Sequence, residues 1–228
     1  MTYRAVLFDL DGTLLDTVDD LADSMNCALA RLGFPGHDTA AYKRLVGDGV
    51  EHLARGALPD GRRDKKTVAQ CLAAMRDEYG KRWANKTRPY AGIPELLDAL
   101  TSRGVPMAVL SNKLDDFTKI ITASLLGKWR FSHAAGARPG VRRKPDPTEA
   151  LRIARDMAVP PADFLYVGDT GTDMRTANAA GMFPVGALWG FRDAQELLEG
   201  GARTLIEKPV ELLGLLDRPP ALTESLNP

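Results

Sequence analysis

Residues 3–17 read YRAVLFDLDGTLLDT, and this stretch decides the fold. Its apolar run at 5–8 is typical of a strand buried on both faces of a sheet. The run ends in Asp9 and Asp11, followed by a glycine turn. Buried charge is costly, so carboxylates placed directly after a buried strand indicate chemistry, although Asp and Gly also form ordinary turns. Carboxylates at the mouth of a parallel sheet can bind a hard metal ion and act as nucleophile or acid/base.

The composition is that of a soluble globular enzyme with one large domain or a core and an accessory domain. The chain has 228 residues, of which 44% are hydrophobic. Thirty basic residues balance thirty acidic ones, so we expect neither nucleic acid nor a membrane as partner. Cys27 and Cys71 lack metal-type spacing and predict reduced thiols. We find no signal peptide pattern and no run of about 20 apolar residues, and we expect a cytoplasmic protein.

Residues 17–87 show only helical periodicity. Apolar side chains recur on one helical face at 17–34, two shorter helical patterns fill 38–57, and a longer one covers 63–84. We find no convincing strand in this part of the sequence. The pattern therefore predicts an all-helical block inserted after the first strand.

Strands and helices alternate after residue 88. The predicted helices lie at 92–103, 114–126, 147–157 and 172–180. The predicted strands lie at 106–110, 131–135, 164–167, 183–187 and 204–206. Such alternation predicts a parallel sheet with helices on both faces. Residues 218–228 are rich in Pro, lack periodicity and predict a loose tail.

Polar side chains follow two more of the predicted strands. Ser111 and Asn112 follow one of them, and Asp169 and Asp173 follow another. A hydroxyl, an amide and the first N–H groups of a helix suit a phosphate, although a Ser/Asn helix cap is the simpler interpretation. Capping does not easily explain Asp169 at the end of a strand.

Lys144 could supply the cation that these groups need. Pro145 biases it toward an extended conformation, and Asp146 and Pro147 suit the N-cap and N1 positions of the next helix. A single lysine is usually a surface residue. Here two strand ends carry carboxylates and a third carries a hydroxyl and an amide, and a nearby cation would balance the carboxylates and a phosphate.

In chain order, these residues resemble the four sequence motifs of the haloacid dehalogenase (HAD) superfamily. The matching stretches are FDLDGTLLDT at 8–17, VLSNK at 109–113, KPDP at 144–147 and YVGDTGTDM at 166–174. The resemblance extends to about residue 190. It implies a doubly wound parallel α/β core formed by residues 1–16 and 88–228, with an all-helical C1-type cap inserted at 17–87.

The resemblance also implies a Mg²⁺-dependent phosphatase. Asp9 would form an aspartyl-phosphate, and Asp11 would protonate the leaving oxygen and then activate water. The carboxylates of Asp9 and Asp169 and the backbone carbonyl of Asp11 would hold Mg²⁺. Asp173 would support the metal's water shell or orient Lys144. The implied phosphate-binding residues are Gly12, Thr13, Ser111, Asn112 and Lys144.

Differences in these motifs among members of the superfamily narrow the choice of reaction type. Dehalogenases of similar fold lack the second aspartate, so Asp11 argues against dehalogenation. Mutases share the whole set, although Thr13 resembles phosphatases more than sugar-phosphate mutases. A β-phosphoglucomutase-like isomerase, a pyrophosphatase and a phosphatase for another small phosphorylated metabolite remain alternatives. A phosphorelay receiver is disfavoured, because its nucleophile is not on the first strand and it has no helical cap.

The cap is expected to select the substrate. Gly47, Asp48 and Gly49 lie between two predicted helices, where glycines allow a ligand to approach the backbone or simply form a flexible turn. The surrounding LVGDGVEHLARGAL at 45–58 is similar to the cap of phosphoglycolate phosphatases, which implies 2-phosphoglycolate as substrate. The nearby cations that could bind its carboxylate are Lys43, Arg44, His52 and Arg55. The sequence leaves a monomer and a homodimer equally open.

Overall fold

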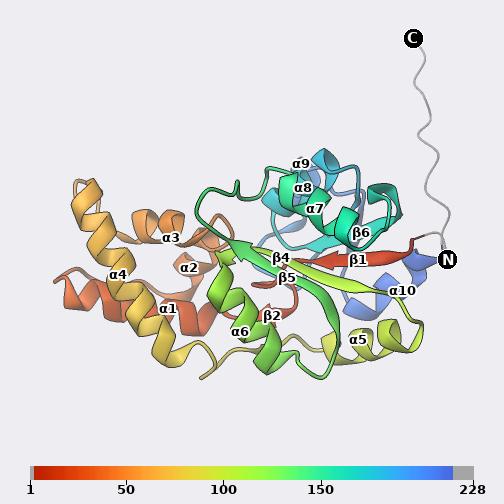
Figure 1. Cartoon of the computed structure of the whole chain (residues 1–228). Helices are drawn as coiled ribbons and strands as arrows, with labels where there is room; N and C mark the ends of the chain where they lie inside the picture. The colour runs from red at the N-terminus through yellow and green to blue at the C-terminus, as the bar shows by residue number, and fades with distance from the viewer. Residues whose placement is uncertain (1–2, 218–228) are drawn as a thin grey trace, which may run out of the picture.

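The structure is a computed structural model that describes residues 3–217, so the predicted tail at 218–228 lies outside the described residues. Its centre is a six-stranded sheet in the order β5-β4-β1-β6-β7-β8 (Figure 1). Every strand runs parallel to its neighbours. The predicted parallel α/β architecture is therefore confirmed. The strands are β1 Ala5–Phe8, β4 Met107–Leu114, β5 Phe131–Ala137, β6 Phe164–Gly168, β7 Phe183–Ala187 and β8 Thr204–Ile206.

Helices cover both faces of this sheet (Figure 1). They are α5 Ile93–Ser102, α6 Asp115–Leu125, α7 Thr148–Asp156, α8 Gly171–Ala179, α9 Ala194–Glu199 and α10 Leu212–Leu216. Alternate residues of β1 point to opposite faces: Val6 and Phe8 pack with α5, α6 and α10, whereas Ala5 and Leu7 pack with α7 and α8. The central strand is thus buried on both faces, as its apolar run predicts.

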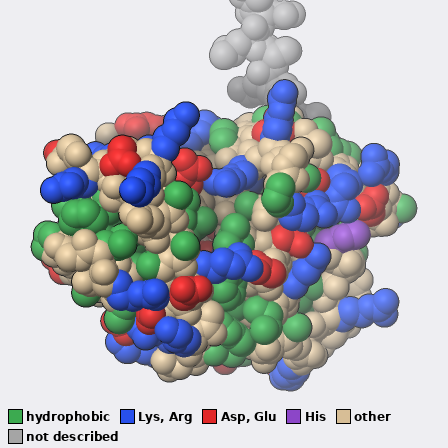
Figure 2. Space-filling view, turned by 60° about the vertical axis from the view of Figure 1, so that its left-hand side comes forward, with side chains coloured by type: hydrophobic (Ala, Val, Ile, Leu, Met, Phe, Trp, Pro, Cys, Tyr) green, Lys and Arg blue, Asp and Glu red, His purple; other side chains and the backbone are tan. Residues whose placement is uncertain are grey.

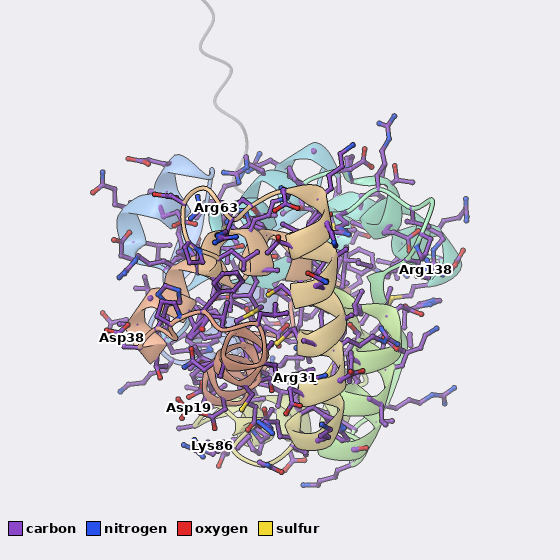
Figure 3. The ribbon with its side chains drawn as sticks, turned by 90° about the vertical axis from the view of Figure 1, so that its left-hand side faces the viewer. Asp19, Arg31, Asp38, Arg63, Lys86 and Arg138 are labelled. Carbon is purple, nitrogen blue, oxygen red and sulfur yellow. The ribbon has the colours of Figure 1, made fainter. Side chains whose placement is uncertain are left out.

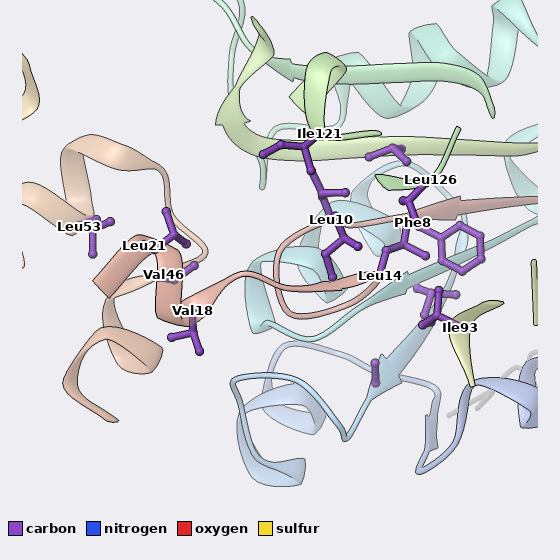
Figure 4. Close-up of a cluster of buried hydrophobic side chains, with 14 of the residues drawn as sticks. Phe8, Leu10, Leu14, Val18, Leu21, Val46, Leu53, Ile93, Ile121 and Leu126 are labelled. Atoms are coloured by element: carbon purple, nitrogen blue, oxygen red, sulfur yellow. The ribbon is translucent and has the colours of Figure 1, made fainter. Parts of the chain in front are cut away.

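Residues 18–82 form a helical block at one end of the sheet (Figure 1). The block consists of α1 Val18–Arg31, α2 Thr39–Leu45, α3 Val50–Ala57 and α4 Lys65–Arg82. Figure 3 shows Arg31 of α1 beside α4, where its Nη1 lies 3.2 Å from the Glu78 carboxylate. Apolar side chains of the block and of the core belong to one buried cluster, shown in Figure 4.

Two adjacent segments connect the helical block to the core. The short strands β2 (Leu15–Asp16) and β3 (Arg88–Pro89) pair antiparallel where the chain enters and leaves the block. The buried Asp20 carboxylate accepts hydrogen bonds from the backbone N–H groups of Lys86 and Thr87, at 2.9 and 2.8 Å. The hydroxyl of Thr87 donates to the same carboxylate at 2.7 Å. The beginning of α1 therefore holds the returning segment.

Several element boundaries differ from the sequence prediction. β4 continues to Leu114, four residues beyond its expected end, because it pairs with β5 again at Ala137 after an irregularity. α7 begins at Thr148 because the Asp146 carboxylate accepts a hydrogen bond from the Thr148 N–H, which leaves Pro147 at the N-cap. α9 and α10 were not predicted, since six and five residues are too few to show helical periodicity.

The surface carries charges of both signs. Figure 2 shows Lys and Arg side chains interspersed with Asp and Glu over one face. None of the helices between residues 3 and 217 has the length and apolar character needed to cross a bilayer. Both thiols are unpaired, with Cys71 buried and Cys27 partly exposed.

Candidate active site

Three of the predicted carboxylates meet at the carboxyl ends of β1 and β6. Asp9 directly follows β1, Asp169 directly follows β6, and Asp173 lies in the first turn of α8. One oxygen from each carboxylate lies within 4.8 Å of the other two. All three side chains are buried. The sheet itself brings them together, because the carboxyl ends of parallel strands share one edge.

Lys144 reaches this cluster from the loop before α7. Its Nζ lies 2.8 Å from Oδ1 of Asp9 and 2.6 Å from Oδ1 of Asp173. The other oxygen of Asp173 accepts hydrogen bonds from the N–H and the hydroxyl of Thr170, at 3.1 and 2.6 Å, and so caps α8. Asp173 therefore connects Lys144 to the first turn of a helix.

The cluster is electrostatically unbalanced. Burial raises the pKa of Asp9 to about 7, although Lys144 acts in the opposite direction. Burial, together with the neighbouring Asp9 and Asp173, raises the pKa of Asp169 well above its usual range. Burial alone would lower the pKa of Lys144, but Asp173 and Asp9 outweigh it and raise that pKa well above its ordinary value. Lys144 thus pairs directly with two of the three buried carboxylates, Asp9 and Asp173.

This donor set fits a hard divalent cation. Oδ1 of Asp9 is buried and accepts no hydrogen bond from residues 3–217, since its contact with Lys144 is an ion pair without hydrogen-bond geometry. Carboxylate oxygens are the ligands that Mg²⁺ prefers. A bound cation would also offset the excess negative charge of the cluster.

The loop after β7 supports Asp169. Oδ1 of Asp169 accepts a hydrogen bond from the hydroxyl of Thr13 at 3.0 Å, and Oδ2 accepts one from the N–H of Phe191 at 2.9 Å. Nε1 of Trp189 donates to the carbonyl of Thr13 at 2.9 Å. Gly12 has φ +86°, and a Cβ at this position would lie 2.2 Å from Oδ2 of Asp169. Only glycine fits this turn without displacing Asp169.

Asp11 lies beside a cation, Lys113, that is not among the predicted site residues. Nζ of Lys113 is 2.8 Å from Oδ1 and 3.1 Å from Oδ2 of Asp11. Both side chains are nearly buried, with exposed fractions of 6% for Lys113 and 10% for Asp11. The hydroxyl oxygen of Ser111 accepts a hydrogen bond from the N–H of Lys113 at 3.2 Å. The end of β4 thus presents a hydroxyl and an ammonium group toward the end of β1.

The amide of Asn112 contacts backbone groups. Its Nδ2 donates to the carbonyls of Gly47 and Lys144, at 3.1 and 3.2 Å, and its Oδ1 accepts from the N–H of Lys144 at 3.0 Å. These bonds use both side-chain N–H groups of Asn112, a residue that the sequence predicts to bind phosphate. In this conformation Asn112 joins the helical block to the segment that carries Lys144.

The predicted cap loop lies against the core. Gly47 and Gly49 line the cavity described below, whereas Asp48 accepts a hydrogen bond from the hydroxyl of Thr172 at 2.8 Å. Gly49 has φ +91°, and a Cβ there would lie 2.9 Å from the guanidinium of Arg143. Two of the three expected loop residues therefore border the site, and the third anchors the loop.

A cavity of about 360 Å³ lies between the helical block and the ends of the strands. Asp9, Asp11 and Ser111 border it on the core side. The helical block supplies apolar walls that include Leu21, Val46, Leu53, Leu72 and Met75.

The cations that line this cavity are Arg76, Lys113 and Arg143. The four cations expected from the sequence (Lys43, Arg44, His52 and Arg55) do not line it. α3 turns Leu53 and Ala57 inward, which leaves His52 and Arg55 exposed on its outer face. None of the four expected cations therefore borders the cavity in this structure, and the three cations that do were not among them.

Known proteins resemble this chain over most of its length. The family model of the haloacid dehalogenase-like hydrolases matches residues 6–187. A phosphoglycolate phosphatase of Xylella fastidiosa is 32% identical over 95% of this chain and 92% of its own length. One from Aquifex aeolicus is 31% identical over 94% and 97%.

Solved structures agree with this assignment. A crystal structure from Lactobacillus delbrueckii subsp. bulgaricus superimposes with a TM-score of 0.87 and 27% identity, covering 95% of this chain and 99% of the other. A hydrolase from Pseudomonas syringae gives 0.72 and 26%, with coverages of 94% and 98%. Because the family model covers most of the sequence and the relatives exceed 30% identity over nearly all of it, the chain belongs to the haloacid dehalogenase-like hydrolases.

Proposed function

We propose that this protein is a Mg²⁺-dependent phosphatase that hydrolyses a small phosphomonoester through a phosphorylated Asp9, and that 2-phosphoglycolate is its substrate. The observation that carries this proposal is the buried cluster of Asp9, Asp169 and Asp173 around Lys144. A cluster with excess negative charge is costly in a buried site unless a cation and a reaction make use of it.

The first step transfers the phosphoryl group to the protein. A carboxylate oxygen of Asp9 attacks phosphorus, and the bond between phosphorus and the ester oxygen breaks. Asp11 must enter this step protonated, with its proton in place of one of the two Lys113 contacts; it gives that proton to the ester oxygen, so the alcohol leaves uncharged. Lys144 and the hydroxyl of Ser111 bind phosphoryl oxygens and offset their charge.

The second step regenerates the enzyme. Asp11 takes a proton from a water molecule, whose oxygen bonds to phosphorus while the bond between phosphorus and Asp9 breaks. Inorganic phosphate leaves, and both carboxyl groups return to their starting states. Mg²⁺ held by Asp9, Asp169 and the carbonyl of Asp11 would neutralise charge on the phosphoryl group in both steps.

Two observations support the choice of substrate. The relatives at 31 to 32% identity carry the name phosphoglycolate phosphatase. The cavity is also bounded by Asp11 on the core side and by a buried cation, Lys113, next to it. A carboxylate on the leaving alcohol would meet that cation.

Phosphate release tests the proposal directly. The purified protein should hydrolyse p-nitrophenyl phosphate and 2-phosphoglycolate in the presence of Mg²⁺, and excess chelator should stop both reactions. Absence of phosphate release from every ester in a panel of small phosphates would refute the function. Conversion of β-glucose 1-phosphate to glucose 6-phosphate at a hundredfold higher kcat/KM would instead identify a mutase.

A further inference from the structure

Lys113 and Tyr79 face each other across the junction between the core and the helical block. Lys113 belongs to β4 and Tyr79 to α4. Nζ of Lys113 lies 4.6 Å from the centre of the Tyr79 ring. Both side chains line the cavity that contains Asp9 and Asp11. The pair therefore borders the same cavity as Asp9 and Asp11, in which the alcohol part of a bound phosphate ester would lie.

The hydroxyl of Tyr79 has unused hydrogen-bonding capacity. The residue is only 3% exposed, and its buried hydroxyl makes no hydrogen bond of good geometry with residues 3–217, although the Lys113 ammonium group lies beside it. Leaving a buried hydroxyl unpaired is unfavourable, so native structures usually supply a partner. A ligand in the cavity can provide that partner.

Lys113 has spare capacity as well. Its ammonium group has three N–H donors. Its hydrogen bonds to the described residues are the two that it donates to the carboxylate oxygens of Asp11. The other cations that line the cavity are differently placed. Arg76 pairs with Asp116 and lies over the Phe117 ring, and Arg143 is exposed beside Gly49. Of the three, Lys113 is the buried cation that adjoins Asp11.

We propose that Lys113 and the hydroxyl of Tyr79 together bind a carboxylate on the alcohol part of the substrate. This inference rests on the proposed function and identifies the residues that select the substrate. Lys113 contacts Asp11 and the bound carboxylate at once, which places the ester oxygen within reach of Asp11. The substrate class is a short phosphomonoester with a carboxylate bonded directly to the ester carbon.

The two halves of this subsite come from different parts of the molecule. The core supplies the ammonium group and the helical block supplies the hydroxyl. The subsite is complete only when the block is docked on the core as in this structure. An ester that lacks the carboxylate makes neither contact. The protein therefore discriminates between esters with and without the carboxylate only when the helical block is docked on the core.

A matched pair of substrates isolates this contact. 2-Phosphoglycolate and 2-hydroxyethyl phosphate differ only by a carboxylate in place of a hydroxymethyl group. The readout is the ratio of their kcat/KM values. We expect Tyr79→Phe to lower this ratio by about tenfold to a hundredfold, the effect of losing one hydrogen bond to a charged group. Lys113→Gln should lower it by at least as much.

The control is Tyr42→Phe. Tyr42 is also a buried tyrosine of the helical block, but its hydroxyl donates to Asn26 at 2.6 Å and it does not line the cavity. This variant should keep the wild-type ratio. A second readout avoids turnover: in an Asp9→Asn background, Tyr79→Phe should raise the Kd of 2-phosphoglycolate and leave that of 2-hydroxyethyl phosphate nearly unchanged.

Failure of the subsite and failure of the function give different results. An unchanged ratio in Tyr79→Phe and Lys113→Gln, with active enzyme, overturns the subsite and leaves the phosphatase intact. A lower kcat/KM ratio in Arg76→Gln or Arg143→Gln, in place of Tyr79→Phe and Lys113→Gln, also overturns the subsite. If the wild-type protein hydrolyses no ester, the proposed function is wrong. In that case, an unchanged Kd of 2-phosphoglycolate on adding Tyr79→Phe to the Asp9→Asn background shows that the subsite is wrong as well.

Discussion

Asp9 is a residue at which reactivity and stability conflict. It is buried with Asp169 and Asp173, and Lys144 balances only part of their charge. Functional sites commonly retain such unfavourable arrangements because the chemistry needs them. Here the same charge that would hold Mg²⁺ and attack phosphorus opposes folding of the metal-free protein.

Turnover should depend on the carboxylate of Asp9. Asp9→Asn removes the nucleophile while keeping the shape of the side chain, so we expect kcat to fall by at least about a thousandfold. Phosphate release from p-nitrophenyl phosphate measures this. The control is Asp156→Asn, which alters a surface partner of Arg152 away from the cavity and should keep wild-type kcat. Near-normal turnover by Asp9→Asn would refute the mechanism.

Without metal, the stability of the folded protein should depend on pH through Asp9. Burial raises the pKa of Asp9 to about 7 from an ordinary value of 3.8, so the folded state holds a proton that the unfolded state releases. The stability that this proton contributes is complete below about pH 4 and is lost as pH rises through about 7. Asn at this position does not titrate. In chelator, Asp9→Asn should therefore become increasingly more stable than wild type between pH 4 and pH 7.

Thermal unfolding of the two proteins at several pH values measures this difference. Saturating Mg²⁺ should reduce it, because the cation stabilises the ionised carboxylates of the folded wild type. A difference that is constant with pH in chelator would contradict the proposed charge balance.

Residues that could be predicted from the sequence share one property. Asp9, Asp11, Ser111 and Asp169 follow apolar runs that are visible in the sequence, so their convergence follows from parallel topology. The contacts of other residues depend on packing. Tyr79 fits the apolar face of a helix and is indistinguishable there from a core residue. Phe191 supports Asp169 through a backbone N–H, which nearly every residue type possesses.

At the scale of elements, three core segments hold the loop between α2 and α3. Asn112 donates to the carbonyl of Gly47, and Thr172 donates to Asp48. The guanidinium of Arg192 donates to the carbonyls of Lys43, Arg44 and Val46, with the last two at 3.0 and 2.8 Å. These carbonyls end α2, where a helix leaves its last C=O groups without internal partners.

Loss of these bonds should loosen the loop. In Arg192→Gln, we expect hydrogen exchange at residues 46–49 to accelerate about tenfold, as charge-assisted bonds are lost. KM for 2-phosphoglycolate should rise more than kcat falls, because Arg192 does not contact the reacting groups. Exchange mass spectrometry and steady-state kinetics measure the two effects.

The matched control for this prediction is Glu196→Gln. It removes the negative charge of Glu196, whose Oε2 lies 2.9 Å from Nε of Arg192. The hydrogen bonds from the guanidinium to the carbonyls of α2 should remain. Exchange at 46–49 should then stay close to wild type. Equal acceleration in both variants would show that the ion pair, and not the carbonyl contacts, holds the loop.

Elements were predictable where their burial pattern was long enough. β1 and β6 are fully buried apolar runs, and α1 and α4 present apolar faces over several turns. The end of β4 was not predictable, because its polar residues pair with β5 only once the sheet has formed. Short elements depend on their neighbours more than on their own sequence.

At the scale of the whole molecule, the helical block and the core share one hydrophobic cluster. Figure 4 shows members from the block, such as Leu21 and Leu53, and members from the core, such as Phe8 and Ile93. Asp20 strengthens this connection through the returning segment at Lys86 and Thr87. We therefore expect the two parts to unfold together, despite the long insertion between β2 and β3.

Pulsed hydrogen exchange during urea unfolding tests this cooperativity, because peptides from 18–82 and from 164–206 should lose protection at the same midpoint. Asp20→Ala should lower both midpoints together, with a loss of about 2–4 kcal/mol of stability, since it leaves the buried N–H and hydroxyl of Thr87 and the part-buried N–H of Lys86 unpaired. Asp23→Ala removes only an exposed ion pair with Lys86 and should cost less than about 1 kcal/mol. Earlier unfolding of 18–82 in wild type would mean that the block folds independently, and the shared cluster would then contribute little to holding the block on the core.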